Sequence, residues 1–280
     1  LPVILTLGLY GELNTGSNQQ LTGMFGTFVV DEFGLFFKLL VMGVLALIIM
    51  SSSDFVAKLG RFGAEYYAIL LFSASGMMLL ASATELISIY IALELTALPI
   101  AALAAFGRDS KSSESGVKFL LLSAMSSAIL LYGMVFVYGY SGTTHLTGIF
   151  QSIQSSLDPN VPFGAYGLFF GIIMMIAGFG FKIAAVPFQM WVPDVYEGAP
   201  TPITAYLSVA SKAAGFAIIL RVFYVAFGDL SVDWSGLFAG LAVASMTLGN
   251  MVAAVQTNIK RMLAYSTVAH AGYIMVGIAS

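Results

Sequence analysis

The stretch AYGLFFGIIMMIAGFGFKIAAVPFQMW, residues 165–191, decides how this chain folds. It contains a single charged side chain, Lys182, and it exceeds the roughly 20 apolar residues that a helix needs to cross a bilayer. The whole chain has the same character, because 59% of its 280 residues are apolar and 9% are charged. A soluble domain carries about 25% charged residues. We therefore predict an all-α fold, a polytopic bundle of transmembrane helices.

Eight apolar runs are long enough to be membrane spans. They cover approximately residues 32–52, 64–83, 85–106, 115–140, 165–191, 202–227, 234–256 and 260–280. Residues 1–10 are apolar but too short to cross alone, so we interpret them as the end of an earlier span. A signal peptide is the alternative, although no basic segment precedes these residues. Because the chain begins without a methionine and ends within an apolar run, we expect it to be a fragment of a longer protein.

The composition argues against several classes of function. A net charge of −3 offers no basic surface for nucleic acid. The absence of cysteine excludes disulfides, Cys-ligated zinc and the usual iron–sulfur clusters from this chain. Only one of the two histidines, His270, falls in a span, so a bis-histidine haem is not expected, and no glycine motif for a dinucleotide or a phosphate follows a strand. We expect no catalytic redox residue, no bound cofactor and no metal here.

Several ionisable side chains fall where a membrane should exclude them. Glu94, Lys182 and Lys212 lie near the middle of spans, and Lys118 lies deeper than the loop before it. Each costs about 3 kcal/mol or more to insert, so each marks a functional hypothesis. Lysine suits a proton relay because desolvation favours its neutral form while a nearby carboxylate restores the charge. His270 is a further relay candidate, since histidine titrates near physiological pH.

Less specific roles remain open for the same residues. A static buried ion pair between Glu94 and Lys182 would only orient helices. Lys118 could extend to the interface along its aliphatic stem, as we expect Lys38 and Arg221 to do near the ends of their spans. His270 could simply make a hydrogen bond between helices.

Prolines and glycines predict discontinuous helices beside two of these charges. Pro99 and Pro187 each follow a mid-span charge by five residues, and each proline frees the carbonyl four residues before it. Gly178 and Gly180 loosen the second of these stretches. Broken helices at this depth are tolerated where they line a hydrated cavity. An ordinary proline kink is the alternative, above all at Pro99.

Residues 146–157 predict a short helix outside the membrane spans. Leu146, Ile149, Phe150, Ile153 and Leu157 recur at helical spacing. We expect this helix to lie on the outer surface, packed on the bundle.

Five motifs together carry a family resemblance. The most specific is GFGFKIAAVPFQMWVPDVYEGAPTP at residues 178–202, supported by LELTALP at 93–99, VKFLLLSAMSSAILLYG at 117–133, SK at 211–212 and NIKRMLAYSTVAHAGY at 258–273. Over essentially its whole length the chain resembles the proton-translocating, antiporter-like subunit N (subunit 2) family of complex I-type NADH:quinone oxidoreductases. Tyr196 stands near a position where the related subunits L and M and Mrp-type antiporters usually carry a histidine, which favours subunit N.

The resemblance implies a fold with two inverted five-helix repeats and broken helices. On this pattern residues 1–63 are N-terminal helices (partial), 64–227 are the first repeat and 234–280 begin the second. The positions that match the family's proton path are Glu94, Lys118, Lys182 and Lys212.

The resemblance also implies a function. The chain would be a membrane-arm subunit that couples quinone reduction by partner subunits to proton translocation, with NADH, FMN, iron–sulfur clusters and quinone bound on those partners. The expected partners are L/M-type and small membrane subunits and the lipid bilayer of a bacterial plasma membrane or an organellar equivalent. The alternatives are an Mrp-type cation/proton antiporter subunit, the equivalent subunit of a membrane-bound hydrogenase or ferredoxin-driven complex, and a purely structural anchor.

Basic residues occupy every second loop, and such residues accumulate in cytoplasmic loops. The basic loops contain Lys58, Arg61, Arg108, Lys111, Lys260 and Arg261, and the intervening loops contain Glu12, Asp31, Asp158, Asp229 and Asp233. The loop 192–201 is the one exception, because it falls on the basic side and is acidic. A cause other than topology must set its sequence.

This pattern predicts that Lys58, Arg108 and Lys260 face the cytoplasm and that Asp31, Asp158 and Asp229 face outward. Single cysteines at positions 58 and 158 should react with a membrane-impermeant thiol reagent from opposite sides. Labelling of both from one side would overturn this topology.

Overall fold

A computed structural model describes residues 21–23, 26–156 and 162–280 of the chain. The interpretations of residues 1–10, Glu12, Leu157 and Asp158 lie outside these ranges. A short antiparallel hairpin of β1 (Leu21–Gly23) and β2 (Phe28–Val30) comes first. The rest of the described chain is largely helical.

The helical elements follow one another along the chain with short connections. In chain order they are α2 (Glu32–Ser51), α3 (Ser53–Leu59), the 3₁₀ turn η2 (Gly60–Phe62), α4 (Gly63–Leu80), α5 (Leu86–Ala104), α6 (Ser110–Ser141), α7 (Leu146–Ser156), α8 (Pro162–Ile183), α9 (Trp191–Gly198), α10 (Thr201–Tyr206), the π-helical turn η3 (Leu207–Ser211), α11 (Lys212–Ala226), the 3₁₀ turn η4 (Gly228–Leu230), α12 (Ser231–Ala254) and α13 (Ile259–Ala279).

Within the described residues, eight helical segments are long and apolar enough to cross a membrane. They agree with the eight predicted spans, except that the helix expected over 165–191 ends at Ile183. The predicted short helix is confirmed as α7, whose Leu146, Ile149 and Ile153 are fully buried against the bundle. Its place on the outer side of the membrane stays a prediction.

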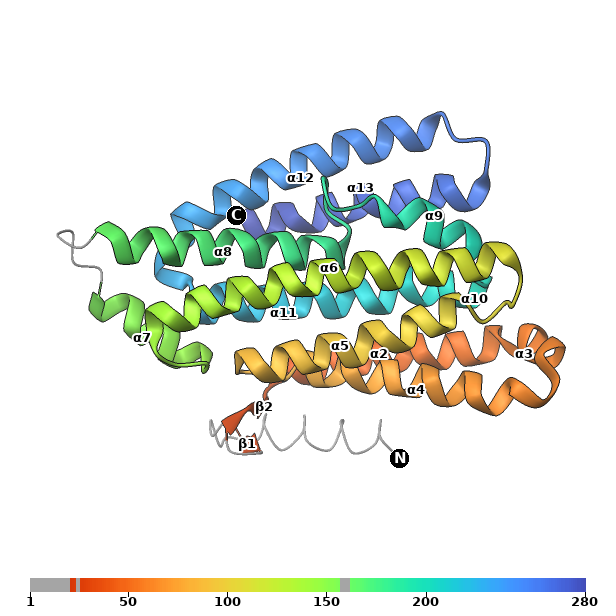
Figure 1. Cartoon of the computed structure of the whole chain (residues 1–280), viewed down its shortest axis with the longest axis horizontal. Coiled ribbons are helices and arrows are strands. Elements are labelled where there is room, and N and C mark those ends of the chain that lie inside the picture. Colours follow the sequence, from red (N-terminus) through yellow and green to blue (C-terminus); the bar gives the residue numbers. More distant parts are fainter. Residues whose placement is uncertain (1–20, 24–25, 157–161) are drawn as a thin grey trace.

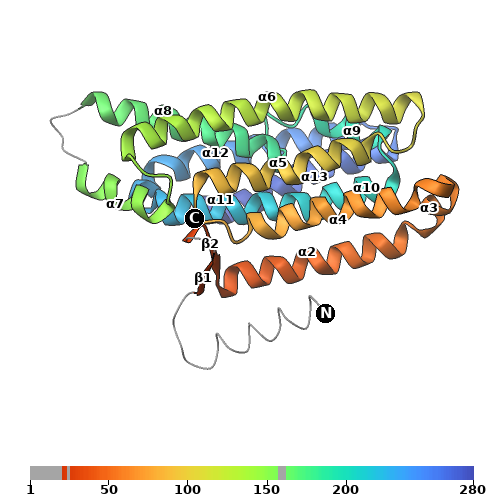
Figure 2. The ribbon, with the colours of Figure 1, turned by 60° about the horizontal axis from the view of Figure 1, so that its bottom comes forward.

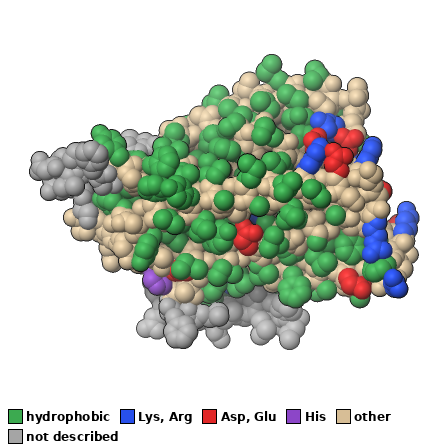
Figure 3. Space-filling view, in the orientation of Figure 1, with side chains coloured by type: hydrophobic (Ala, Val, Ile, Leu, Met, Phe, Trp, Pro, Cys, Tyr) green, Lys and Arg blue, Asp and Glu red, His purple; other side chains and the backbone are tan. Residues whose placement is uncertain are grey.

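The spans run roughly along the long axis of the molecule (Figure 1). The α12–α13 hairpin lies along the top in Figure 1. In Figure 2, α2 forms the lower edge of the bundle, and α6 and α8 lie along the opposite edge. The helix α3 and the α5–α6 and α12–α13 turns lie at one end, and β2 and α7 lie at the other (Figure 1). Apart from one acidic patch in the apolar middle, the charged side chains visible in Figure 3 gather at one end. The basic loops thus share one end, and the assignment of that end to the cytoplasm stays a prediction.

In a bilayer the hydrophobic effect does not drive helices together, so they associate through close packing, which small residues allow. A Cβ at Gly133 of α6 would lie 2.7 Å from the carbonyl oxygen of Gly171 in α8, and a Cβ at Gly171 would lie 2.9 Å from that of Gly133. The two backbones therefore touch, and side chains larger than hydrogen would separate α6 from α8.

Arg221 fastens three helices together near the end that carries β2. Its two terminal nitrogens each donate a 2.9 Å hydrogen bond to the carboxylate of Asp31, which also caps the start of α2 by accepting from the Gly34 N–H. The same guanidinium donates at 3.1 and 2.8 Å to the carbonyl of Ala81, at the end of α4. Arg221 is only 7% exposed, so the expectation that it extends to the interface is wrong. A fixed bidentate partner holds it inside.

Replacing Arg221 with methionine should lower the unfolding free energy of the full-length subunit by about 3 kcal/mol, because Asp31 and the Ala81 carbonyl would lose their partner. Thermal unfolding in detergent would measure this. The control is Lys58→Met at an exposed position, which should change stability by less than about 0.5 kcal/mol. Equal losses in both variants, or full additivity of Arg221→Met with Asp31→Asn, would contradict a coupled pair.

Candidate functional site

The site is built around a break in a transmembrane helix. α8 ends at Ile183, and residues 184–190 connect it to α9 without helical structure. Pro187 lies within this break, and its peptide bond with Val186 is cis. Ala184 has a positive φ of 62°, so the chain leaves the helix immediately after α8 ends.

The other residues expected to break helices do not interrupt them. The break predicted at Pro99 is wrong, because α5 continues through this proline, which removes one helical hydrogen bond without ending the helix. Gly178 and Gly180 lie inside α8, ahead of the break. A Cβ at Gly178 would lie 2.6 Å from Cβ of Leu130, so this glycine serves the contact with α6.

The backbone of the break is supplied with partners from inside the protein. The Ala185 N–H donates to the Gly180 carbonyl at 2.8 Å, and the Val186 N–H donates to the hydroxyl of Ser245 in α12 at 2.9 Å. The indole N–H of Trp191 donates to the Phe181 carbonyl at 3.1 Å. Irregular backbone at membrane depth is stable only with such partners.

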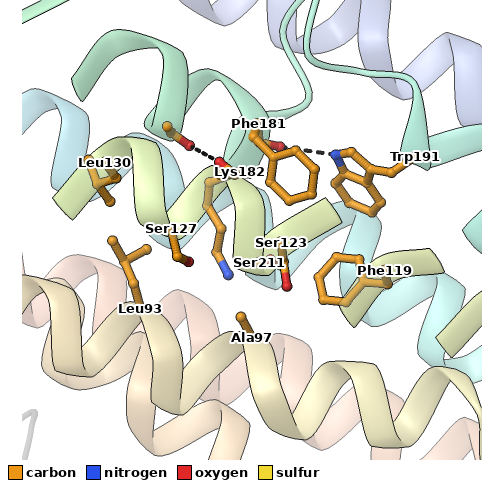
Figure 4. Close-up of a pocket in the computed structure, with 12 residues that line it drawn as sticks. Leu93, Ala97, Phe119, Ser123, Ser127, Leu130, Phe181, Lys182, Trp191 and Ser211 are labelled. Atoms are coloured by element: carbon orange, nitrogen blue, oxygen red, sulfur yellow. Dashed lines mark hydrogen bonds between the residues drawn. The ribbon is translucent and has the colours of Figure 1, made fainter. Parts of the chain in front are cut away.

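Lys182 occupies the last turn of α8, directly before the break, and is 8% exposed. Its ammonium has no hydrogen-bond partner among the described residues. It points into a cavity of about 30 Å³, which is room for one or two water molecules. Figure 4 shows the side chain directed toward Ser123 and Ser127 of α6. A buried ammonium facing hydroxyls and water-sized space is equipped to exchange a proton.

Glu94 lies on α5, the helix that supplies Leu93 and Ala97 to the cavity wall. Its Oε1 is buried without a partner, and its charge attracts that of Lys182 through space. The two described side chains make no direct ion pair, since the Lys182 ammonium is unbonded. Neither the Lys182 ammonium nor Glu94 Oε1 is therefore held by a hydrogen bond within the described residues.

Lys212 is 6% exposed and follows the π-helical turn η3 at the start of α11. Such turns are frequent at functional sites. Ser211, the last residue of η3, lines the Lys182 cavity, whereas Lys212 donates at 2.7 Å to the carbonyl of Thr267 on α13. Buried polar groups, Ser211 and Lys212, thus lie between the Lys182 cavity and α13.

Lys118 lies apart from the Lys182 cavity. Its ammonium binds Glu114 at 2.8 Å and Asp194 at 3.0 Å, and its side chain is 43% exposed. Asp194 also forms an ion pair with the Arg261 guanidinium at 2.8 Å, and the same guanidinium pairs with the Glu197 carboxylate at 3.1 Å. We call the open cavity of about 260 Å³ among these side chains the charged vestibule. Its lining residues are Lys111, Glu114, Ser115, Lys118, Asp194, Glu197, Gly198 and Arg261.

The charged vestibule explains the acidic loop that the sequence left as an exception. Burial raises the pKa of Asp194, but hydrogen bonds and charges from Lys118 and Arg261 outweigh it and hold the pKa of that carboxyl below its ordinary value. Asp194 and Glu197 are therefore partners for cations on α6 and α13. Their sequence follows from these pairs rather than from topology.

His270 lines neither cavity. It lies on an exposed face of α13, with Nδ1 at 2.8 Å from the Ser266 carbonyl and its ring 5.6 Å from that of Tyr273. The part of the chain that the structure describes contains no group of three or more acidic or histidine side chains placed to hold a metal.

Sequence reasoning missed the serines that line the charged vestibule and the Lys182 cavity, and the aromatic residues beside them. Ser115, Ser123 and Ser126 lie on the buried face of α6, and this helical spacing is a signal that could have found them. Phe119 and Trp191 resemble ordinary apolar residues in the sequence, and only the fold brings them together.

Comparison with known proteins identifies the family. Residues 83–280 match the family described as "NADH:quinone oxidoreductase/Mrp antiporter, TM". The chain is 51% identical to the NADH-quinone oxidoreductase subunit N of Dehalococcoides mccartyi and 50% identical to that of Moorella thermoacetica, over 91% and 99% of its own length. These alignments cover 53% and 58% of the relatives, so the chain spans about half the length of the curated relatives it matches.

Solved structures agree. The respiratory complex I of Thermus thermophilus contains a chain that matches with a TM-score of 0.79 at 32% identity, over 99% of this chain and 56% of that one. The Mrp complex from Dietzia matches with a TM-score of 0.80 at 21% identity, over 99% and 51%, and this likeness shows the fold alone. The resemblance seen in the motifs is confirmed, and the chain belongs to the NADH:quinone oxidoreductase/Mrp antiporter transmembrane family.

Proposed function

We propose that this chain is part of a subunit N of a NADH:quinone oxidoreductase and carries protons within the membrane arm of that complex. The single observation that carries the proposal is Lys182, a buried ammonium without a hydrogen-bond partner, facing a water-sized cavity at a helix break. The subunit N relatives at 51% and 50% identity support the choice of complex.

In this proposal Lys182 alternates between its charged and neutral forms. Burial disfavours the charged form, and the nearby charge of Glu94 restores it. When Lys182 releases its proton, water in the cavity and the hydroxyls of α6 receive it. Lys212, bonded to α13, is the next group along the membrane. Lys118 in the charged vestibule and His270 on the outer face of α13 would then serve the ends of the route.

The redox chemistry belongs to other chains in this proposal. NADH, FMN, iron–sulfur clusters and quinone are assigned to partner subunits, and L/M-type and small membrane subunits are its neighbours in a bacterial plasma membrane or its organellar equivalent. Residues 64–227 would form the first inverted repeat and 234–280 the start of the second, after the N-terminal helices of residues 1–63. This chain converts free energy released by quinone reduction into proton movement.

An Mrp-type cation/proton antiporter is the second candidate, because its fold is the same. Tyr196, which is fully buried beside Trp191, favours the quinone-linked complex over the antiporter. Vesicles that exchange sodium for protons without NADH oxidation would favour the antiporter instead.

Lys182→Arg and Lys182→Ala should both assemble, and both should lose proton-coupled activity by at least about tenfold, because arginine keeps the charge but does not release a proton. NADH-driven proton pumping in membrane vesicles is the measurement, and Lys58→Arg and Lys58→Ala are the matched surface controls. Full activity in Lys182→Arg, with failed assembly only in Lys182→Ala, would make Lys182 a structural cation.

Glu94→Gln should lower pumping and NADH oxidation by the same factor, since an obstructed proton path slows the electron transfer coupled to it. Both rates would be recorded on the same vesicles. The exposed Glu65 of α4 provides the control Glu65→Gln, which should leave both rates unchanged. Normal pumping and oxidation in Glu94→Gln would reduce Glu94 to a structural role.

A further inference from the structure

Two cavities of different character lie one after the other along α6. The charged vestibule takes Lys111, Glu114, Ser115 and Lys118 from the first turns of this helix. The Lys182 cavity takes Ser123, Ser126, Ser127 and Leu130 from the following turns. Phe119, which is 2% exposed, lies between these two sets on the buried face and forms the first part of the wall of the Lys182 cavity.

The α9 side of the border is also aromatic. Trp191 begins α9 and lines the Lys182 cavity, whereas Asp194 lies one turn further along α9 and lines the charged vestibule. The rings of Phe119 and Trp191 meet edge to face at 5.0 Å between centroids. Phe181 completes the cluster at 5.3 Å from Trp191 and 6.4 Å from Phe119. Figure 4 shows these three rings together beside the Lys182 side chain.

The polar groups next to the cluster are already bonded. The Trp191 N–H is committed to the Phe181 carbonyl, and the Ser115 hydroxyl is committed to the Val195 carbonyl at 2.9 Å. A Cβ at Gly198 would lie 2.6 Å from the Lys111 carbonyl oxygen, so α6 and α9 touch on the vestibule side as well. The line of hydroxyls on α6 is therefore interrupted at Phe119, and no side chain that the structure describes on this face of α6 bridges the interruption with a polar group.

We propose that Phe119, Phe181 and Trp191 form a hydrophobic gate between the charged vestibule and the Lys182 cavity. This inference rests on the proposed function, because the gate controls whether water and protons from the vestibule reach Lys182. A proton needs a chain of water or hydroxyls, and three packed rings supply neither. Phe181 lies in the last turn of α8, two residues before its end, and Trp191 begins α9, so two of the three rings lie close to the break at residues 184–190. A shift of that break would part the rings and admit water.

Cysteine accessibility tests the gate, because the 280 residues of this chain include no cysteine. The complete complex in nanodiscs would be treated with a cationic methanethiosulfonate reagent, and labelling rates would be read by mass spectrometry of the peptide that contains the new cysteine. Glu114→Cys in the charged vestibule should react quickly. Ser123→Cys in the Lys182 cavity should react at least about tenfold more slowly, as expected if the open gate is a minor state.

Substitution of Phe119 should then change the rate at position 123. Phe119→Ser, which continues the line of hydroxyls, should raise labelling of Ser123→Cys at least about tenfold by turning the minor open state into the main one. Phe119→Leu keeps an apolar plug and should leave the rate low. Phe119→Ala replaces Phe119→Ser if the serine variant does not assemble.

Equal labelling of Ser123→Cys and Glu114→Cys with Phe119 in place would overturn the gate, and so would a rate at position 123 that Phe119→Ser and Phe119→Ala leave unchanged. A passive proton leak in vesicles without NADH, raised by Phe119→Ser and not by Phe119→Leu, is the second expected result. Labelling at position 123 does not depend on proton transfer by Lys182. Failure of the proposed function, seen as full activity in Lys182→Arg, is therefore distinguishable from failure of the gate.

Discussion

Every backbone N–H and carbonyl inside a bilayer needs a partner from the protein, and this constraint governs the structure around it. The break between α8 and α9 meets it with the Ser245 hydroxyl of α12, the Trp191 indole and the Gly180 carbonyl. These bonds fix where α12 and α9 must lie relative to α8. α8 is able to end inside the bundle because neighbouring helices supply these partners, and Lys182 in its last turn faces the cavity.

The charged side chains in the vestibule form ion pairs, whereas the lysines deeper in the bundle do not. At the end of the bundle, Lys118 and Arg261 are paired with Asp194 and Glu197 in an open vestibule, where such pairs add little stability. In the interior, Lys182 has no bonded partner among the described residues, and Lys212 bonds a neutral carbonyl. Permanent pairing would fix the interior charges in place, whereas unpaired groups beside hydroxyls are able to gain and lose protons. This arrangement is the one that the proposed proton relay requires.

Much of the fold could be predicted from the sequence, because span length and hydropathy are local properties. All eight spans and the helix α7 were found in this way. The helix end at Ile183 and the burial of Arg221 could not be predicted, since each depends on a neighbour distant in the chain. At Pro99 the sequence left a break and an ordinary kink both open, and the helix continues. Within the site, the rule that charges in the middle of a span are functional identified Lys182 and Lys212. The same rule placed Lys118 with them, whereas the structure places it in the charged vestibule. Lys118 instead pairs with Asp194 of α9, which is 76 residues away in the chain and which no local pattern brings to it.

The bond between Arg221 and Asp31 joins residues 190 positions apart, which has a consequence for synthesis in the cell. At roughly 5 to 20 residues per second, Asp31 leaves the ribosome roughly 10 to 40 seconds before its partner exists. During that interval the start of α2 has no cation from α11 to hold it. The early helices are therefore made before their final attachment can form, and this part of the bundle cannot be completed before Arg221 is synthesised.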